Sequence, residues 1–145
     1  MRWLQPLIYA IVSRCLWPFA AVILGLRLLR GKEHPARWRE KLGHRMAARP
    51  KGPIVWIHAV GLGEVLSARS VVDQLARRDP RLWFLVTSST RQSAQVFEQH
   101  APPRCIHQFL PFDCPPFVRR FLNHWTPSLS IWIEQDFWPN LVNET

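Results

Sequence analysis

The chain has 145 residues, the size of a single domain, and 48% of them are hydrophobic, a composition that excludes a wholly disordered protein. Its formal net charge of +9 comes from one end: residues 1–51 carry 11 Lys/Arg and 2 Asp/Glu, whereas residues 52–145 carry 8 of each. A nucleic-acid-binding domain would carry basic side chains over its folded part as well, so we expect no nucleic-acid partner and favour contact between the N-terminal third and an anionic membrane surface.

Three cysteines, Cys15, Cys105 and Cys114, are odd in number and form no Cys-x-x-Cys pair. This pattern argues against a disulfide framework and against a zinc site, and it indicates a reducing compartment.

Residues 1–30 are predicted to form a membrane-associating helical segment. They are mostly apolar, but Arg14 and Arg27 interrupt them, and the longest uncharged stretch before Arg27 has 12 residues. Because a spanning helix needs about 20 apolar residues, a helix lying in the membrane interface is favoured. A single span and a buried core helix remain alternatives.

Residues 31–53 are rich in Gly, Pro and charge and are predicted to be a basic connector with a short basic helix within residues 34–43.

From residue 54 onward, apolar runs typical of strands alternate with segments whose apolar residues have helical spacing. Strands are expected at 54–60, 82–87, 105–110 and 129–133, and helices at 64–78, 90–99, 115–124 and from Pro139 onward. The alternation predicts an α/β fold with an open, Rossmann-like parallel sheet over residues 54–145. An open sheet with only four strands by residue 145 looks unfinished, so we expect the chain to be a fragment of a longer protein.

Ligands of open α/β sheets bind beyond the carboxyl ends of the strands. Several polar residues and glycines are expected there: Gly61, Gly63, Glu64, Ser88, Ser89, Asp113, Glu134 and Asp136. The Gly61–Gly63 turn is not a dinucleotide fingerprint, because Leu66 stands where the third glycine would be and Glu64 would repel phosphate at the helix start. Glu64 is therefore either a helix charge stabilised by the helix dipole or a general base.

The other candidates have ordinary structural interpretations. Asp113 is interpreted as a turn residue, residues 88–90 as an N-cap cluster, and His58 and His107 as core histidines. Glu134 is either a helix cap or a site carboxylate. The sequence contains no spacing typical of metal ligands.

Five blocks, in order along the chain, carry a resemblance to a known family. They are Ala36-Arg37-Trp38-Arg39-Glu40-Lys41-Leu42-Gly43, His58-Ala59-Val60-Gly61-Leu62-Gly63-Glu64-Val65, Thr87-Ser88-Ser89-Thr90, Leu110-Pro111-Phe112-Asp113 with the segment to Pro127, and Glu134-Gln135-Asp136-Phe137-Trp138-Pro139-Asn140. Together they resemble the N-terminal domain of the 3-deoxy-D-manno-octulosonic acid (Kdo) transferases.

The resemblance implies the N-terminal half of a GT-B glycosyltransferase, with the donor-binding half absent from this chain, so that the chain alone is expected to be inactive. The family transfers Kdo with inversion from CMP-Kdo to the lipid A precursor lipid IVA in lipopolysaccharide biosynthesis, at the cytoplasmic face of the inner membrane, without a metal or other cofactor. Glu64 would be the general base, and Glu134 would assist the transition state. Residues implied to bind the acceptor are Gly61, Gly63, Ser88, Ser89 and Arg37.

Two positions depart from the family pattern: Gly61 stands where a serine is usual, and Asp136 stands where a glutamate is usual. Two other functions also remain open. The chain could be a non-catalytic membrane-binding fragment, or it could belong to another GT-B glycosyltransferase with a different nucleotide-sugar donor.

Overall fold

The computed structural model describes residues 4–133 and 138–145. The chain divides into two compact units, which are described separately. The helical unit comprises Met1–Arg45, Pro111–His124 and Phe137–Thr145, and the sheet unit comprises Met46–Leu110 and Trp125–Asp136.

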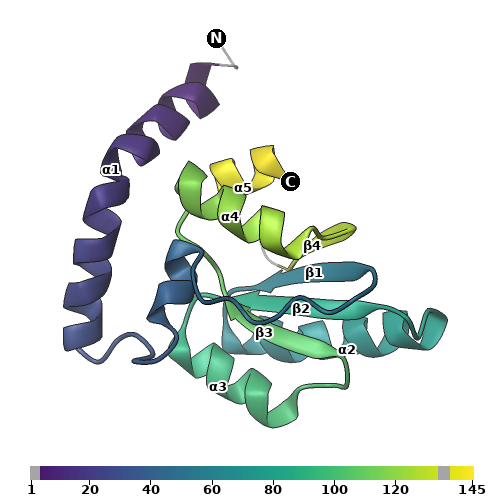
Figure 1. Cartoon of the computed structure of the whole chain (residues 1–145). Coiled ribbons are helices and arrows are strands. Elements are labelled where there is room, and N and C mark those ends of the chain that lie inside the picture. The colour runs from purple at the N-terminus through teal and green to yellow at the C-terminus, as the bar shows by residue number, and fades with distance from the viewer. Residues whose placement is uncertain (1–3, 134–137) are drawn as a thin grey trace. The chain divides into compact units, whose positions relative to one another are not determined.

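The sheet unit contains four parallel strands (Figure 1). They are β1 (Ile54–Ala59), β2 (Trp83–Ser88), β3 (Cys105–Phe109) and β4 (Leu129–Ile133). The predicted α/β class with an open parallel sheet is confirmed, and each strand lies within two residues of its expected bounds. All six residues of β1 are buried, as expected for a central strand that reads as a continuous apolar run.

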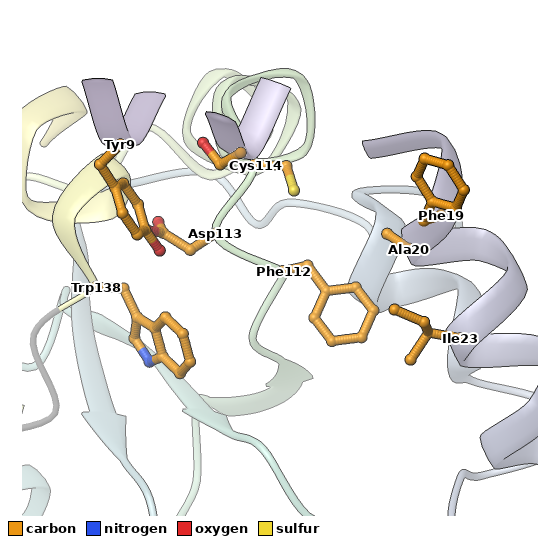
Figure 2. A pocket seen from close by; sticks show the side chains of 9 residues that line it. Tyr9, Phe19, Ala20, Ile23, Phe112, Asp113, Cys114 and Trp138 are labelled. Atoms are coloured by element: carbon orange, nitrogen blue, oxygen red, sulfur yellow. The ribbon is translucent and has the colours of Figure 1, made fainter. Parts of the chain in front are cut away.

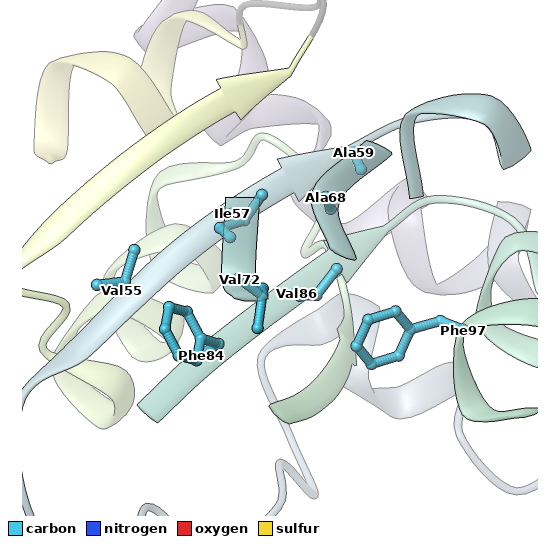
Figure 3. Packing of buried hydrophobic residues seen from close by; sticks show 8 residues of the cluster. All are labelled: Val55, Ile57, Ala59, Ala68, Val72, Phe84, Val86 and Phe97. Atoms are coloured by element: carbon cyan, nitrogen blue, oxygen red, sulfur yellow. The ribbon is translucent and has the colours of Figure 1, made fainter. Parts of the chain in front are cut away.

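One face of the sheet packs against helices α2 (Leu62–Arg78) and α3 (Arg91–His100). Figure 3 shows the resulting core, which is built from alternate residues of the strands and the inward faces of the two helices. Its buried members are Val55, Ile57, Ala59, Ala68, Val72, Phe84, Val86 and Phe97.

The strand order is β3-β2-β1-β4. The chain builds outward from β1 through β2 to β3 and then returns to the other side of β1, so the order reverses between β1 and β4. In open α/β sheets the ligand crevice lies at such a reversal, beyond the carboxyl ends of the strands. Here those ends are in register, with Ala59 of β1 opposite Ile133 of β4.

The helical unit contains the expected N-terminal helix, α1 (Leu4–Leu29), followed by α4 (Pro115–Trp125), whose last residue belongs to the sheet unit, and α5 (Pro139–Glu144). The short basic helix expected within residues 34–43 is a 3-10 helix, η1 (Trp38–Leu42). It ends at Gly43, whose φ of 68° lies in the left-handed region that glycine adopts without penalty.

Helix α1 has one buried and one exposed face. Ser13, Ala20 and Leu24 are buried at helical spacing, and Ala20 packs against a cluster that includes Phe117. The exposed face carries large apolar side chains: Ile11, Val12, Phe19, Val22, Ile23, Leu26 and Leu29. Over residues 4–133 and 138–145, no helix has both the length and the hydropathy that crossing a bilayer requires.

Candidate functional site

Glu64 lies in the first turn of α2, just beyond the carboxyl end of β1. Gly61 is the N-cap of this helix and has an extended backbone. The carboxylate of Glu64 folds back over Gly61, with its Cδ 3.4 Å from the position that a Cβ on Gly61 would take. Glu64 is partly exposed, and among the described residues no hydrogen bond or ion pair engages its carboxylate.

The neighbouring Gly63 has open space at the position of a side chain. It is exposed, and no atom lies within 4 Å of the position that a Cβ on it would take. Gly63 itself thus presents only its backbone at the surface. Its contact with an acceptor stays a prediction.

The hydroxyl residues at the end of β2 and just beyond it have partners within the protein. Ser88 is fully buried, and its Oγ is 2.9 Å from Nε2 of His107. Thr90 is the N-cap of α3 and accepts a hydrogen bond from the backbone N–H of Ser93 at 3.1 Å, which confirms the N-cap interpretation at this position. Ser89 is half-buried. Acceptor binding by Ser88 and Ser89 stays a prediction.

His58 is a core histidine, as the sequence suggested. It is 1% exposed, and its Nδ1 lies 3.0 Å from Oγ1 of Thr87, which also accepts a hydrogen bond from Nε1 of Trp56 at 2.9 Å. The ring of Trp132 packs edge-on against the histidine at 5.2 Å between centroids. Thr87 thus joins two aromatic side chains of β1 beneath the carboxyl edge of the sheet.

Glu134 and Asp136 lie outside the described residues. Glu134 follows Ile133, the last residue of β4, directly in sequence. Its proposed part in catalysis therefore stays a prediction.

Arg37 lies in the helical unit and pairs with Glu40. Its Nε and Nη2 donate to the two carboxylate oxygens of Glu40 at 2.7 and 2.9 Å, a bidentate geometry. Acceptor binding by Arg37 stays a prediction. Among the other basic residues of this unit, Arg30, Lys32 and Arg39 are exposed.

A buried ion pair lies within residues 31–53, the segment expected to be a connector. Glu33 is 2% exposed and Lys41 is 4% exposed, and Nζ of Lys41 is 2.6 Å from Glu33. Arg27 contacts the other carboxylate oxygen at 2.6 Å. Burial lowers the pKa of Lys41, and Glu33 opposes this effect. The sequence does not indicate this pair, because charged residues of a basic, proline-rich segment are ordinarily solvated.

The helical unit also holds a mostly apolar pocket of about 280 Å³ (Figure 2). Its lining residues are Tyr9, Ser13, Phe19, Ala20, Ile23, Phe112, Asp113, Cys114 and Trp138. Burial, together with the charge of Asp113 and a hydrogen bond to it, raises the pKa of Tyr9 to about 12. Asp113 lies at a bend, as expected, and its carboxylate also accepts the backbone N–H groups of Asn140 and Leu141, a long-range contact that no local pattern indicates.

No group of three His, Cys, Asp or Glu side chains in the described part of the chain could hold a metal ion.

Residues 36–145 match the sequence model of the 3-deoxy-D-manno-octulosonic-acid transferase (kdotransferase) family. The chain is 41% identical over 116 residues to a probable mitochondrial 3-deoxy-D-manno-octulosonic acid transferase of Arabidopsis thaliana, covering 80% of this chain and 26% of that protein. It is 38% identical over 137 residues to the 3-deoxy-D-manno-octulosonic acid transferase of Rickettsia bellii, covering 94% of this chain and 33% of that enzyme. The corresponding protein of Haemophilus influenzae is 30% identical over 128 residues, with 88% of this chain and 30% of that protein covered. The chain thus spans between a quarter and a third of the length of these relatives, and it belongs to the 3-deoxy-D-manno-octulosonic acid transferase family, whose N-terminal domain it represents.

Proposed function

We propose that this chain is the acceptor-binding part of an inverting glycosyltransferase that moves Kdo from CMP-Kdo to lipid IVA, with Glu64 as the general base. The observation that carries the proposal is the accessible carboxylate of Glu64 at the carboxyl end of β1, beside the reversal of strand order between β1 and β4. Family membership supports the choice of sugar.

In the proposed reaction this domain supplies one chemical group, the base that takes the proton of the acceptor hydroxyl. The acceptor hydroxyl oxygen attacks the anomeric carbon of Kdo, the bond from that carbon to the CMP oxygen breaks, and the proton of the hydroxyl passes to Glu64. Because CMP leaves as a stabilised phosphate anion, no acid is needed at the leaving group. The proposed base, Glu64, lies in the first turn of α2, just beyond the carboxyl end of β1.

We assign binding of the donor, CMP-Kdo, to a second domain. The relatives are three to four times longer than the segment that matches this chain, which leaves room for a CMP-Kdo-binding domain of the GT-B type. We propose that Glu134, which directly follows the last residue of β4 in sequence, aids the transition state. No metal or other cofactor enters this proposal.

We assign contact with the membrane and with the phosphates of the acceptor to the helical unit. The exposed apolar face of α1 suits the acyl region of a bilayer, and the exposed Arg30 and Lys32 just beyond it suit anionic headgroups and the phosphates of lipid IVA. We propose that α1 lies on the cytoplasmic face of the inner membrane.

The test of the base is Glu64→Gln in a full-length protein that joins this chain to a donor-binding domain. Glutamine keeps the size of the side chain but cannot accept the proton, so transfer of Kdo to lipid IVA should fall at least a hundredfold with folding unchanged. Unchanged transfer would remove Glu64 as the base. Transfer from UDP-sugars rather than CMP-Kdo would instead favour a different GT-B enzyme.

A non-catalytic membrane-binding module is the second candidate, and the exposed apolar face of α1 favours it. Membrane binding without Kdo transfer by the full-length protein would support it.

A further inference from the structure

The pocket of the helical unit is continuous with the exposed apolar face of α1. All of its lining residues belong to this unit. Phe19 and Ile23 line the pocket, yet they are 59% and 53% exposed, so both also belong to the exposed face. Figure 2 shows these two side chains across the pocket from Tyr9 and Asp113. An apolar molecule can therefore enter the pocket from the surface that we assign to the membrane without crossing water.

Three polar side chains of the lining are bonded within the protein. The carboxylate of Asp113 accepts the backbone N–H groups of Asn140 and Leu141 at 3.0 and 2.9 Å. It also accepts a hydrogen bond from the hydroxyl of Tyr9. Oγ of Ser13 accepts a hydrogen bond from Nδ2 of Asn140 at 3.0 Å. A ligand with a charged end would have to break these buried bonds, whereas a hydrocarbon chain leaves them intact.

We propose that this pocket binds part of one acyl chain of the lipid acceptor. Its volume of about 280 Å³ is at the lower end of ligand pockets, which hold roughly 300–1,000 Å³, so it takes a segment of one chain rather than a whole lipid. The inference rests on the proposed function, because it takes the acceptor to be a lipid held at the membrane surface.

The acceptor fits the pocket better than the bulk phospholipid of the bilayer does. A chain gains little hydrophobic free energy on passing from a bilayer into an apolar pocket, because both surroundings are apolar. Contact with bulk lipid needs only the exposed face of α1. A substrate, in contrast, must be held in place while its hydroxyl reacts, and an enclosed pocket restricts the chain that enters it. The exposed Arg30 and Lys32 beyond α1 suit the phosphates of the same lipid.

The direct test is photolabelling of the full-length protein in vesicles with two lipids that carry the same diazirine at the end of one acyl chain. One lipid is lipid IVA, and the other is phosphatidylglycerol. We expect the lipid IVA probe to label Ala20 and Phe112, which line the pocket, about tenfold more than the phosphatidylglycerol probe does at equal concentration. Peptide mass spectrometry locates the labels.

Two results of the labelling would overturn the proposal. Equal labelling of the pocket by both probes would show a site for any bilayer lipid. Labels confined to exposed side chains of α1, such as Val12 and Val22, would show that no chain enters the pocket.

A substitution at the mouth of the pocket tests its part in acceptor binding. Ile23→Trp narrows the mouth and keeps the exposed face apolar, so binding to vesicles should persist. Displacing one methylene group into water costs about fourfold in affinity, so KM for lipid IVA should rise about fourfold or more with kcat unchanged. Val142→Trp on α5, outside the pocket, is the control and should leave KM unchanged. An unchanged KM in Ile23→Trp, or a rise matched by an equal loss of vesicle binding, would count against the pocket.

Failure of this inference differs from failure of the proposed function. If the unmodified full-length protein transfers no Kdo to lipid IVA, the proposed function is wrong. If it transfers Kdo and the lipid IVA probe labels only residues outside the pocket, the proposed function stands and the acyl subsite is overturned.

Discussion

The carboxylate of Asp113 accepts the backbone N–H of Asn140 at 3.0 Å, and the side chain of Asn140 returns a hydrogen bond to the backbone oxygen of Asp113 at 2.7 Å. The second carboxylate oxygen of Asp113 accepts the N–H of Leu141 at 2.9 Å. These two N–H groups belong to the first turn of α5 and have no partner within that helix. A residue 27 positions earlier in sequence therefore caps α5.

Replacing Asp113 should destabilise the helical unit. Asp113→Ala leaves two buried N–H groups without acceptors, and we expect the free energy of unfolding to fall by about 1–3 kcal/mol in urea denaturation. Glu144→Gln is the control, because Glu144 pairs with Arg119 at the surface, where a salt bridge contributes about 1 kcal/mol or less. Equal effects of the two substitutions would show that the cap of α5 contributes little.

Two glycines with nearly equal φ provide a matched pair. Gly43 has φ 68° and Gly31 has φ 69°, so alanine at either position meets the same backbone penalty of about 1–2 kcal/mol. A Cβ at Gly43 would also lie 2.9 Å from the backbone oxygen of Phe117 and 3.0 Å from Cβ of Arg120, whereas a Cβ at Gly31 meets nothing within 4 Å.

We therefore expect Gly43→Ala to cost about 1–3 kcal/mol more than Gly31→Ala in the free energy of unfolding, the usual cost of overpacking. Thermal unfolding of the two variants side by side measures the difference. Equal midpoints would mean that the segment around residue 43 moves aside without cost.

The strand and helix pattern was predictable because each element carries its signal locally. β1 is a run of β-branched and aromatic residues, and Glu64 follows it at the helix start, so the base candidate and its place at the sheet edge both follow from sequence. Strand alternation could also have indicated that Ser88 faces away from Thr87. The hydrogen bond from Ser88 to His107, however, depends on the pairing of β2 with β3.

Long-range contacts could not be predicted in the same way. Asp113 and Asn140 are 27 positions apart and come together only when their segments pack, and Glu33 and Lys41 are buried together only when the segment after α1 folds. No local sequence pattern predicts either contact. Local propensity therefore specified the elements, and tertiary packing determined which charged side chains are buried.

The three thiols should differ in reactivity. Cys15 is exposed, whereas burial and Asp73 raise the pKa of Cys105 to about 12, and burial and Asp113 raise that of the buried Cys114. Because the thiolate is the reactive form, N-ethylmaleimide at pH 8 should label Cys15 at least about tenfold faster than the other two. Peptide mass spectrometry checks this, and Cys15→Ser should abolish the fast phase. Fast labelling of Cys105 would contradict the partial burial of this thiol and its raised pKa.

Stability should decline at alkaline pH. Cys105 and Tyr9 have folded-state pKa values of about 12, against 9.0 and 10.0 in the unfolded chain. Between pH 9 and pH 12 the unfolded chain binds fewer protons than the folded one, so the free energy of unfolding falls as pH rises. The contribution of these two groups to the free energy of unfolding is complete below pH 9 and is lost as the pH rises to 12. Urea midpoints should fall over this range, and Cys105→Ala should flatten the part between pH 9 and pH 10, whereas Cys15→Ala should not.

The exposed face of α1 should bind anionic membranes. Val22 on α1 is 60% exposed and Val142 on α5 is 44% exposed, so the same change to glutamate can be made at both positions. Burying a valine side chain in an apolar phase is worth about 1.5–3 kcal/mol, so Val22→Glu should weaken binding to vesicles containing phosphatidylglycerol by about tenfold or more. Val142→Glu should leave it unchanged in the same co-sedimentation assay. Binding should also fall with added salt, because the exposed cations beyond α1 contribute to it. Equal losses from both substitutions would assign the effect to net charge and would remove α1 as the membrane-binding surface.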